Sequence, residues 1–403
     1  MNSKKVLPVK WSEIPRDAKT YMLYHTIIAP QLIIWYLLPL YMMYSGYSVL
    51  EVGAFFTAVN IISIPLTYLI GRFFNEYPLK TGLILIDALD GIAYILYGFA
   101  KGSIAPLMLF LGYTIEEISS LFYPLYQAYE QIIYPEDKYE EIFAWHLRLP
   151  EISQLIGFLI LGYLFGYIWN TAEHYRKAFI VFGLFSVFTI AYLWKFLPPV
   201  GREERISPEK FTFKIDKEFK FLLLIEALFT LAWSLAPEIV LLNYVIFELH
   251  KTIFEVMLIE GAISVATIIA TYVSERVPKD KGFRAIGIGM FLLSIYALIM
   301  SLSPPFWFVL AAYFIGRFGD TLAFPFYRSW MFSLIPKEKA SEFHAALSSY
   351  RRLIGLFTPF VAGALASIKA TLPYFVSLIL FLIISALFIK FEKIASKTKT
   401  QES

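Results

Sequence analysis

The sequence predicts an all-α membrane protein with twelve transmembrane helices in two pseudo-symmetric six-helix bundles. Of its 403 residues, 58% are hydrophobic and only 17% are charged, whereas a soluble domain is roughly 45–50% apolar and about 25% charged. The apolar residues form twelve stretches, and the two halves of the chain repeat each other about 200 residues apart. Helices satisfy all their backbone hydrogen bonds internally, so each apolar stretch is predicted to cross the bilayer as a helix.

The predicted spans follow one another with short loops and one long polar interruption. In chain order they cover residues 21–44, 49–74, 81–100, 103–133, 143–169, 175–197, 219–247, 252–275, 283–302, 305–335, 342–368 and 371–391.

The polar interruption contains Pro198, Pro199, Gly201 and Pro208 among alternating charges, as is typical of a linker. The basic N-tail has no short apolar core that ends in a cleavage site, so no removable signal peptide is expected. The predicted organisation is an N-tail over 1–20, an N-terminal bundle over 21–197, a linker over 198–218, a C-terminal bundle over 219–391 and a C-tail over 392–403.

The distribution of positive charge predicts which way the chain faces. Of the 35 Lys and Arg residues, 25 lie in the two tails, in the loops that follow even-numbered spans or within the three span residues next to them, and five lie in or equally close to the opposite loops. Positive loops remain in the cytoplasm. We therefore expect a multi-pass protein of the cell membrane with both termini cytoplasmic.

An internal repeat relates the two halves. Trp35 matches Trp233, and the helix-start pattern from Ser48 to Glu51 matches the one from Thr252 to Glu255. In both patterns a hydroxyl is followed three residues later by an acid, which predicts a capped helix start. The matched pairs keep their order, and their offsets stay between 198 and 204 residues. Such repeats are found in transporters that expose one central site to alternate sides of the membrane.

At these residues the chain resembles the major facilitator superfamily. Ser45-Gly46-Tyr47-Ser48 resembles the first outer loop of that family, and Ser274 to Lys279 resembles its cytoplasmic G-x-L-A-D-R-x-G-R signature, with Glu275 at the acid position. The stretch from Arg351 to Gly363 resembles its glycine- and proline-rich eleventh helix. The resemblance covers about residues 20–391 and implies alternating access and a monomer.

One departure from the family pattern concerns the fourth span. Proton-driven antiporters of the family often carry an arginine midway along this helix, but here Glu116 and Glu117 stand there, and the corresponding arginine, Arg317, lies on the tenth span. The familiar antiport scheme is therefore not directly transferable.

Charged residues within the spans give the strongest chemical signal. Charges near the bilayer centre cost about 2.5–3.5 kcal/mol each on insertion scales, so they should face the bundle interior or water. Acids outnumber bases, which calls for bound protons or a cationic cargo. The acids are Asp87, Asp90, Glu116, Glu117, Glu130, Glu151, Glu226, Glu238, Glu260 and Asp320, and the bases are Arg148, Arg317, Arg328, Arg351 and Arg352.

The predicted substrate and proton site combines mid-membrane acids with aromatic residues. Arg317 and Asp320, three residues apart, are expected to form a local ion pair that could also bind an anionic group. Aromatic faces attract organic cations. The site comprises Asp90, Glu116, Glu117, Glu226, Arg317, Asp320, Tyr94, Tyr113, Tyr123, Gln31 and Trp35.

A second set of charges, near the predicted cytoplasmic ends, is interpreted as a salt-bridged gate, with Glu275 and Arg328 as its first candidate pair. The set comprises Glu130, Arg148, Glu151, Glu275, Arg276, Arg328, Arg351 and Arg352. Gly91, Gly98, Gly157 and Gly162 are expected to permit close helix packing.

The predicted function is secondary active transport of a small solute by alternating access, with proton coupling and export of a cationic or amphipathic compound as the favoured form. Uptake of a neutral or anionic solute such as a sugar or organic acid is the alternative, and a membrane-embedded enzyme or receptor is a remote one. No cofactor and no nucleic acid are expected. Metal transport stays open, because the acids could bind hard cations, but no histidine or cysteine cluster is expected to select a transition metal. His25 is interpreted as a satisfied polar residue.

Overall fold

The computed structural model describes residues 10–73, 78–135, 139–199, 217–274, 276–278, 281–334 and 340–401. Within these ranges every regular element is a helix. Contacts between Cα atoms divide the chain into unit 1, Met1–Tyr41 with Ala58–Ser207, and unit 2, Met42–Thr57 with Pro208–Ser403. Each unit is described by itself.

Unit 1 contains the first predicted span up to Tyr41, the second span from Ala58 onward, and the third to sixth predicted spans. Its first helix is interrupted by a 3₁₀ segment, Ala29–Ile33, which contains Pro30. Its fourth predicted span is broken between residues 120 and 124. The helices are α1 (Arg16–Ile28), α2 (Ile34–Tyr44), α4 (Leu79–Phe99), α5 (Ala105–Ser120), α6 (Pro124–Ile133), α7 (Tyr139–Tyr163) and α8 (Ala172–Phe196).

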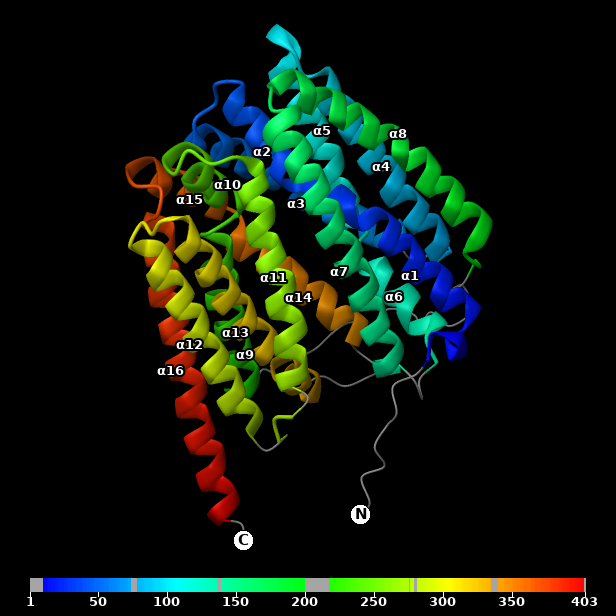
Figure 1. The fold of residues 1–403 in the computed structure, drawn as a ribbon. Helices are drawn as coiled ribbons and strands as arrows, with labels where there is room; N and C mark the ends of the chain where they lie inside the picture. The colour runs from blue at the N-terminus through cyan, green and yellow to red at the C-terminus, as the bar shows by residue number, and fades with distance from the viewer. Residues whose placement is uncertain are drawn as a thin grey trace. The chain divides into compact units, whose positions relative to one another are not determined.

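Unit 2 holds the second set of helices and the start of α3 (Val49–Phe73) (Figure 1). A short π-helical segment, Asn243–Glu248, follows α10. The helices are α9 (Lys217–Ser234), α10 (Glu238–Leu242), α11 (Ile253–Ser274), α12 (Gly282–Ser301), α13 (Phe306–Ser333), α14 (Ala340–Gly355), α15 (Thr358–Ile368) and α16 (Leu372–Gln401).

Residues 42–57 lie with unit 2, whereas the sequence analysis assigned them to the first bundle. The reason is close packing on α15, where the Oγ of Thr57 accepts a hydrogen bond of 3.0 Å from the backbone N–H of Phe360. A Cβ added at Gly363 would lie 2.8 Å from the backbone oxygen of Val49. By their contacts these residues group with unit 2, and the predicted domain boundaries stay a prediction.

The two predicted helix starts are confirmed. The Glu51 carboxylate accepts hydrogen bonds of 2.7 Å from the backbone N–H and the hydroxyl of Ser48. Glu255 accepts from the backbone N–H of Thr252 at 2.9 Å and from its hydroxyl at 2.6 Å. Each carboxylate thus satisfies a backbone donor that the first turn leaves free.

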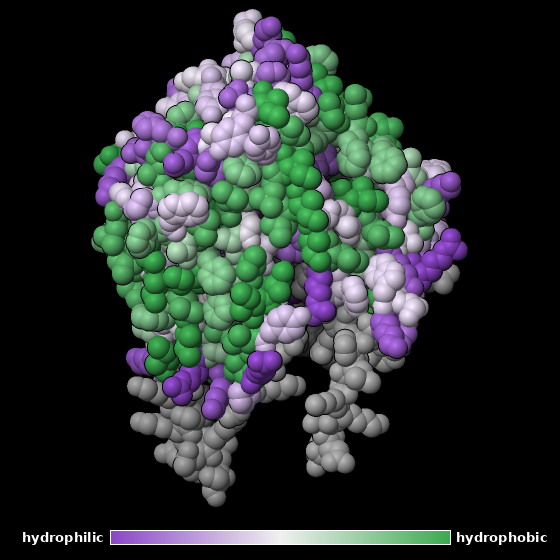
Figure 2. All heavy atoms as spheres, in the orientation of Figure 1, coloured by the Kyte–Doolittle hydropathy of each residue, from purple (hydrophilic) through white to green (hydrophobic). Residues whose placement is uncertain are grey.

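Nine helical segments of the described residues are long and apolar enough to cross a membrane. The other three predicted spans, 49–74, 103–133 and 305–335, are helical as well, as α3, as α5 with α6, and as α13. Large apolar side chains stand exposed on the outer faces, such as Val187 at 64% and Trp194 at 74%. Figure 2 shows such apolar side chains covering helical surfaces, as a lipid-facing surface requires.

Close helix contacts fix the walls of unit 1. α4 packs against α8, where a Cβ at Gly91 would lie 2.8 Å from the Cβ of Ser186 and a Cβ at Gly183 would lie 2.8 Å from the backbone oxygen of Gly91. The prediction that Gly91 permits close packing is confirmed. This crossing places the acids of α4 beside the hydroxyls of α8.

Candidate functional site

Unit 1 contains a cavity of about 310 Å³ between its helices. Among the lining residues that the structure describes are three acids and two histidines but no lysine or arginine. The lining comprises His25, Ile28, Ala29, Gln31, Leu32, Trp35, Asp87, Asp90, Tyr94, Tyr123, Tyr126, His146, Pro150, Glu151, Gln154, Ser186 and Thr189.

The two acids of α4 lie one turn apart on the cavity wall. Asp87 is 7% exposed, and its Oδ1 accepts a hydrogen bond of 2.5 Å from the hydroxyl of Tyr24. Asp87 Oδ2 and Asp90 Oδ1 are buried and have no hydrogen-bond partner among the described residues. A buried polar atom without a partner costs about 1–3 kcal/mol, and more when it is charged. The wall is therefore suited to receive a proton or a cation.

The acids of α5 lie outside the lining of this cavity. Glu116 is half-buried and accepts a hydrogen bond from the hydroxyl of Tyr97, one turn from Tyr94 on α4. Glu117 and Tyr113 are half-buried on the same helix. Of the predicted acids in unit 1, the structure thus brings Asp90 to the cavity and ties Glu116 to the neighbouring helix.

The aromatic and amide residues predicted for the site reach the cavity. Tyr94, Tyr123, Gln31 and Trp35 all line it. Gln31 donates a hydrogen bond of 3.1 Å to the backbone oxygen of Phe182, which fixes its side chain. Trp35 is 47% exposed, so its ring is accessible.

In unit 2, the predicted site residue Glu226 is held in an ion pair. Glu226 is 1% exposed. Its carboxylate accepts hydrogen bonds of 2.6 and 2.7 Å from the guanidinium of Arg351. The hydroxyl of Tyr327 donates to the same carboxylate at 2.6 Å. Bidentate hydrogen bonds between charged groups are stronger than hydrogen bonds between neutral groups. Arg351, which was predicted for the gate, therefore forms an ion pair with Glu226, which was predicted for the substrate site.

The predicted ion pair of α13 is confirmed. Arg317 donates to the Oδ2 of Asp320 at 3.2 Å and to the hydroxyl of Thr267 at 3.0 Å. Asp320 therefore has a basic partner on its own helix, in contrast to the acids on α4.

The other predicted gate residues lie in different surroundings. Glu151 lines the unit 1 cavity and Glu130 is buried in the same unit. Arg148 and Arg276 are exposed, Arg352 is half-buried, and Arg328 stands 4.7 Å from the ring centre of Phe324. Glu275 lies outside the described residues, so its pair with Arg328 stays a prediction.

One cluster was missed by the sequence analysis. His25 on α1, Glu130 on α6 and His146 on α7 each offer one ligand atom, and these atoms lie within 4.8 Å of one another. The sequence did not predict that these side chains lie together, and the expectation that no histidine cluster selects a transition metal stays a prediction. His25 and His146 stand far apart in the sequence with no motif around either, so only the packing of three helices brings them together.

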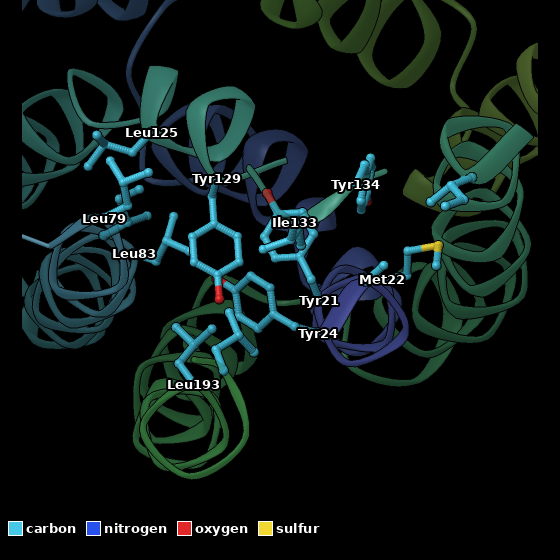
Figure 3. Close-up of a cluster of buried hydrophobic side chains, with 14 of the residues drawn as sticks. Tyr21, Met22, Tyr24, Leu79, Leu83, Leu125, Tyr129, Ile133, Tyr134 and Leu193 are labelled. Carbon is cyan, nitrogen blue, oxygen red and sulfur yellow. The ribbon is translucent and has the colours of Figure 1, made fainter. Parts of the chain in front are cut away.

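Tyrosines surround this cluster. Tyr21 and Tyr24 of α1 point toward Tyr129 of α6 in Figure 3, with Tyr134 nearby. The rings of Tyr21 and His25 lie 4.6 Å apart, and those of His25 and His146 lie 4.9 Å apart. Of these tyrosines none had been predicted as a site residue.

A family model described as Major Facilitator Superfamily matches residues 33–359. No curated protein matches the chain. Among solved structures, a bacterial homologue of the iron transporter ferroportin in the inward-facing state is similar at 18% identity and a TM-score of 0.74, over 94% of this chain and 98% of that one. A bacterial metal transporter is similar at 16% identity and a TM-score of 0.69, over 94% and 98%.

A transporter of the POT family in complex with 5-aminolevulinic acid is similar at 14% identity and a TM-score of 0.68, over 94% of this chain and 98% of that one. At these identities the likeness concerns the fold alone. The predicted fold class is confirmed by the family match and by these structures.

Proposed function

This chain belongs to the Major Facilitator Superfamily and is a secondary transporter, and we propose that it exports a cationic solute by alternating access in exchange for protons. The observation that carries the proposal is the unit 1 cavity, whose lining includes Asp87, Asp90 and Glu151 but, within the described part of the chain, no lysine or arginine.

The charge of this lining favours a cation. A carboxylate in a membrane interior is costly unless an opposite charge, a proton or water offsets it. Asp87 and Asp90 each have one buried carboxylate oxygen that no described residue donates to. The rings of Tyr94, Tyr123 and Trp35 in the same lining would attract an organic or amphipathic cation through their faces.

Proton coupling follows from the same acids if a proton and the cargo compete for them. Asp90 stands on the cavity wall, and Glu116, which accepts a hydrogen bond from Tyr97, lies on α5 outside the lining. A carboxyl group that is protonated when the cargo is absent and ionised when the cargo is bound exchanges a proton for the cargo. We assign this exchange to Asp90, with Glu116 as the second candidate.

Uptake of a neutral or anionic solute is less well supported. Its basic partners would be Arg317, Arg351 and Arg352, but Arg351 is engaged by Glu226 and Arg317 by Asp320. A membrane-embedded enzyme or a receptor finds no support in the family match, which is to transporters.

The similar structures widen the choice of cations to test. Two of them are described as a homologue of an iron transporter and as a metal transporter. Inorganic as well as organic cations therefore belong in the test.

The proposal is tested with purified protein in liposomes that contain a pH-sensitive dye. Organic cations, divalent metal ions, sugars and carboxylates are added in turn, and we expect proton movement with cations only. Asp90→Asn should reduce this movement to the level of empty liposomes, because the exchanged charge is gone. Glu248→Gln, which removes an exposed acid of unit 2, is the matched control and should behave like the unaltered protein.

Two results would contradict the proposal. One is cation transport that is constant from about pH 5 to about pH 8 and unchanged in both Asp90→Asn and Glu116→Gln. The other is transport of sugars or carboxylates that disappears in Arg317→Ala.

A further inference from the structure

We propose that His25, Glu130 and His146 bind a divalent first-row transition-metal ion and that this ion is the cargo. The inference rests on the proposed function, because it names the kind of cation that the unit 1 cavity receives. Both histidines are part of the lining of that cavity.

Three helices supply the three ligands. His25 comes from α1, Glu130 from α6 and His146 from α7, and their ligand atoms lie within 4.8 Å of one another. The Nδ1 of His146 is 3.4 Å from the Oε1 of Glu130. Glu130 and His146 are 8% and 9% exposed, so this part of the site is shielded from solvent.

The free nitrogen of His25 is the second, independent observation. Its Nε2 is buried and has no hydrogen-bond partner among the described residues. The edges and faces of Tyr21, Tyr24 and Tyr126 pack around the ring at centroid distances of 4.6, 5.0 and 5.0 Å and hold it in place. A buried imidazole nitrogen without a partner costs about 1–3 kcal/mol, and binding a metal ion would remove that cost.

Neighbouring hydroxyls orient the other two ligands. The hydroxyl of Tyr134 is 2.7 Å from the Nδ1 of His146, a contact that orients the ring when the Nε2 is the ligand atom. The hydroxyl of Tyr21 donates to the Oε1 of Glu130 at 3.3 Å. Metal-binding histidines and carboxylates generally have such outer partners, which fix their orientation.

The donor atoms indicate the class of metal. Two imidazole nitrogens and one carboxylate suit iron, zinc, cobalt or nickel, whereas magnesium and calcium prefer oxygen ligands alone. The chain has no cysteine, so a soft thiolate site is excluded. Three protein ligands leave positions open for water, which suits an ion that must leave again.

The acids of α4 connect this site to the rest of the cavity. The hydroxyl of Tyr24 donates to Asp87 at 2.5 Å and lies 3.2 Å from the hydroxyl of Tyr126. Both tyrosine rings touch His25. A doubly charged ion at the histidines would therefore lie in one cavity with the carboxylates that offset its charge.

The ligand atoms are spaced closely enough for one ion to reach all three. Two ligand atoms on one ion can be no more than about 4.2 Å apart, which is twice a metal–nitrogen distance of about 2.1 Å. The three ligand atoms lie within 4.8 Å of one another, and the Nδ1 of His146 is 3.4 Å from the Oε1 of Glu130.

The first experiment measures Co²⁺ binding to the full chain in detergent, purified with an affinity tag that contains no histidine. We expect saturable binding of one Co²⁺ with visible absorption bands typical of nitrogen coordination, and no competition from excess Mg²⁺. His25→Ala and His146→Ala should each weaken binding by about tenfold or more. His250→Asn, at an exposed histidine of unit 2, is the matched control and should leave it unchanged.

A second measurement does not depend on variants that fold. X-ray absorption of the Co²⁺-loaded unaltered protein should show imidazole scattering from two histidines. The proposal is overturned if Co²⁺ does not bind saturably, if the bound ion has no imidazole ligand, or if both histidine variants fold and bind Co²⁺ as before.

Transport in the liposomes separates this inference from the proposed function. Movement of organic cations without Co²⁺ movement or binding overturns the metal site and leaves the proposed function standing. Movement of no cation at all overturns the proposed function. Co²⁺ bound by the histidines but not moved overturns its role as cargo.

Discussion

Buried acids are stabilised differently in the two units. In unit 2, Glu226 receives two charged hydrogen bonds from Arg351 and a third from Tyr327. In unit 1, Asp87 receives one from Tyr24, and its second oxygen has no donor among the described residues. A carboxylate paired with an arginine of the same chain has a structural role. A carboxylate that accepts hydrogen bonds only from hydroxyls is available to bind a proton or a cationic cargo.

At the scale of single residues, we predict how the protein's stability depends on the ion pair of Glu226. Arg351→Ala would leave this carboxylate, at 1% exposure, without its positive partner. Breaking a fully buried pair from one side costs about 3 kcal/mol or more, and the cost here is smaller because the Arg351 side chain is 45% exposed. The unfolding temperature in detergent should therefore fall, as measured by tryptophan fluorescence or differential scanning calorimetry.

A control for this prediction is Arg148→Ala, which removes an exposed arginine and should change stability by about 0.5 kcal/mol or less. The double variant Glu226→Gln with Arg351→Ala should recover part of the loss, because the uncompensated charge is gone. Equal stability of Arg351→Ala and the unaltered protein would show that the pair is not structural.

At the scale of elements, interruptions of the helices coincide with the cavity. Ala29 and Gln31 lie in the 3₁₀ segment between α1 and α2, and Tyr123 lies in the break between α5 and α6. All three line the cavity. Irregular backbone is tolerated at membrane depth where it is buried in protein or faces water, so the interruptions are consistent with a wet chamber.

The element prediction concerns the crossing of α4 and α8. In Gly183→Ala the new methyl group would lie 2.8 Å from the backbone oxygen of Gly91, so the helices must separate. Overpacking of this kind costs about 1–3 kcal/mol. We expect a lower unfolding temperature and weaker cation binding, because the walls that carry Asp90 and Ser186 move apart.

The neighbouring Leu184 provides the comparison, since its side chain is 59% exposed on α8. Leu184→Ala should lower the unfolding temperature less than Gly183→Ala does and leave cation binding unchanged. Equal effects of the two substitutions on binding would show that the crossing does not position the cavity walls.

At the scale of the whole molecule, local signals predicted the fold well. The capping acids Glu51 and Glu255 and the Arg317 to Asp320 pair were predicted because each interaction spans three residues, which helix geometry fixes. Predicting the fold required only the length, periodicity and repetition of apolar stretches.

Interactions between distant helices were not predictable in the same way. Glu226 and Arg351 are 125 residues apart, and the sequence placed one in the substrate site and the other in the gate. His25 and His146 were missed because spacing along a chain says nothing about which helices become neighbours. The sequence could thus predict that the site is acidic and aromatic. Which side chains pair with one another depends on how the helices pack.

The last prediction concerns the orientation of the whole chain. The excess of Lys and Arg in the tails and in the loops after even-numbered spans predicts that these segments are cytoplasmic. Because the chain has no cysteine, each single-cysteine variant reports on one position without background. Ser12→Cys and Lys281→Cys test the predicted cytoplasmic side, and Ser103→Cys tests the opposite side; all three positions are exposed.

In intact cells, a membrane-impermeant maleimide should label Ser103→Cys only, and after the cells are opened it should label all three. The unaltered chain is the control and should remain unlabelled throughout. Labelling of Ser12→Cys or Lys281→Cys in intact cells would reverse the assigned orientation. Export and uptake are defined relative to the cytoplasmic side. With the orientation reversed, the cargo movement that we propose as export would be uptake.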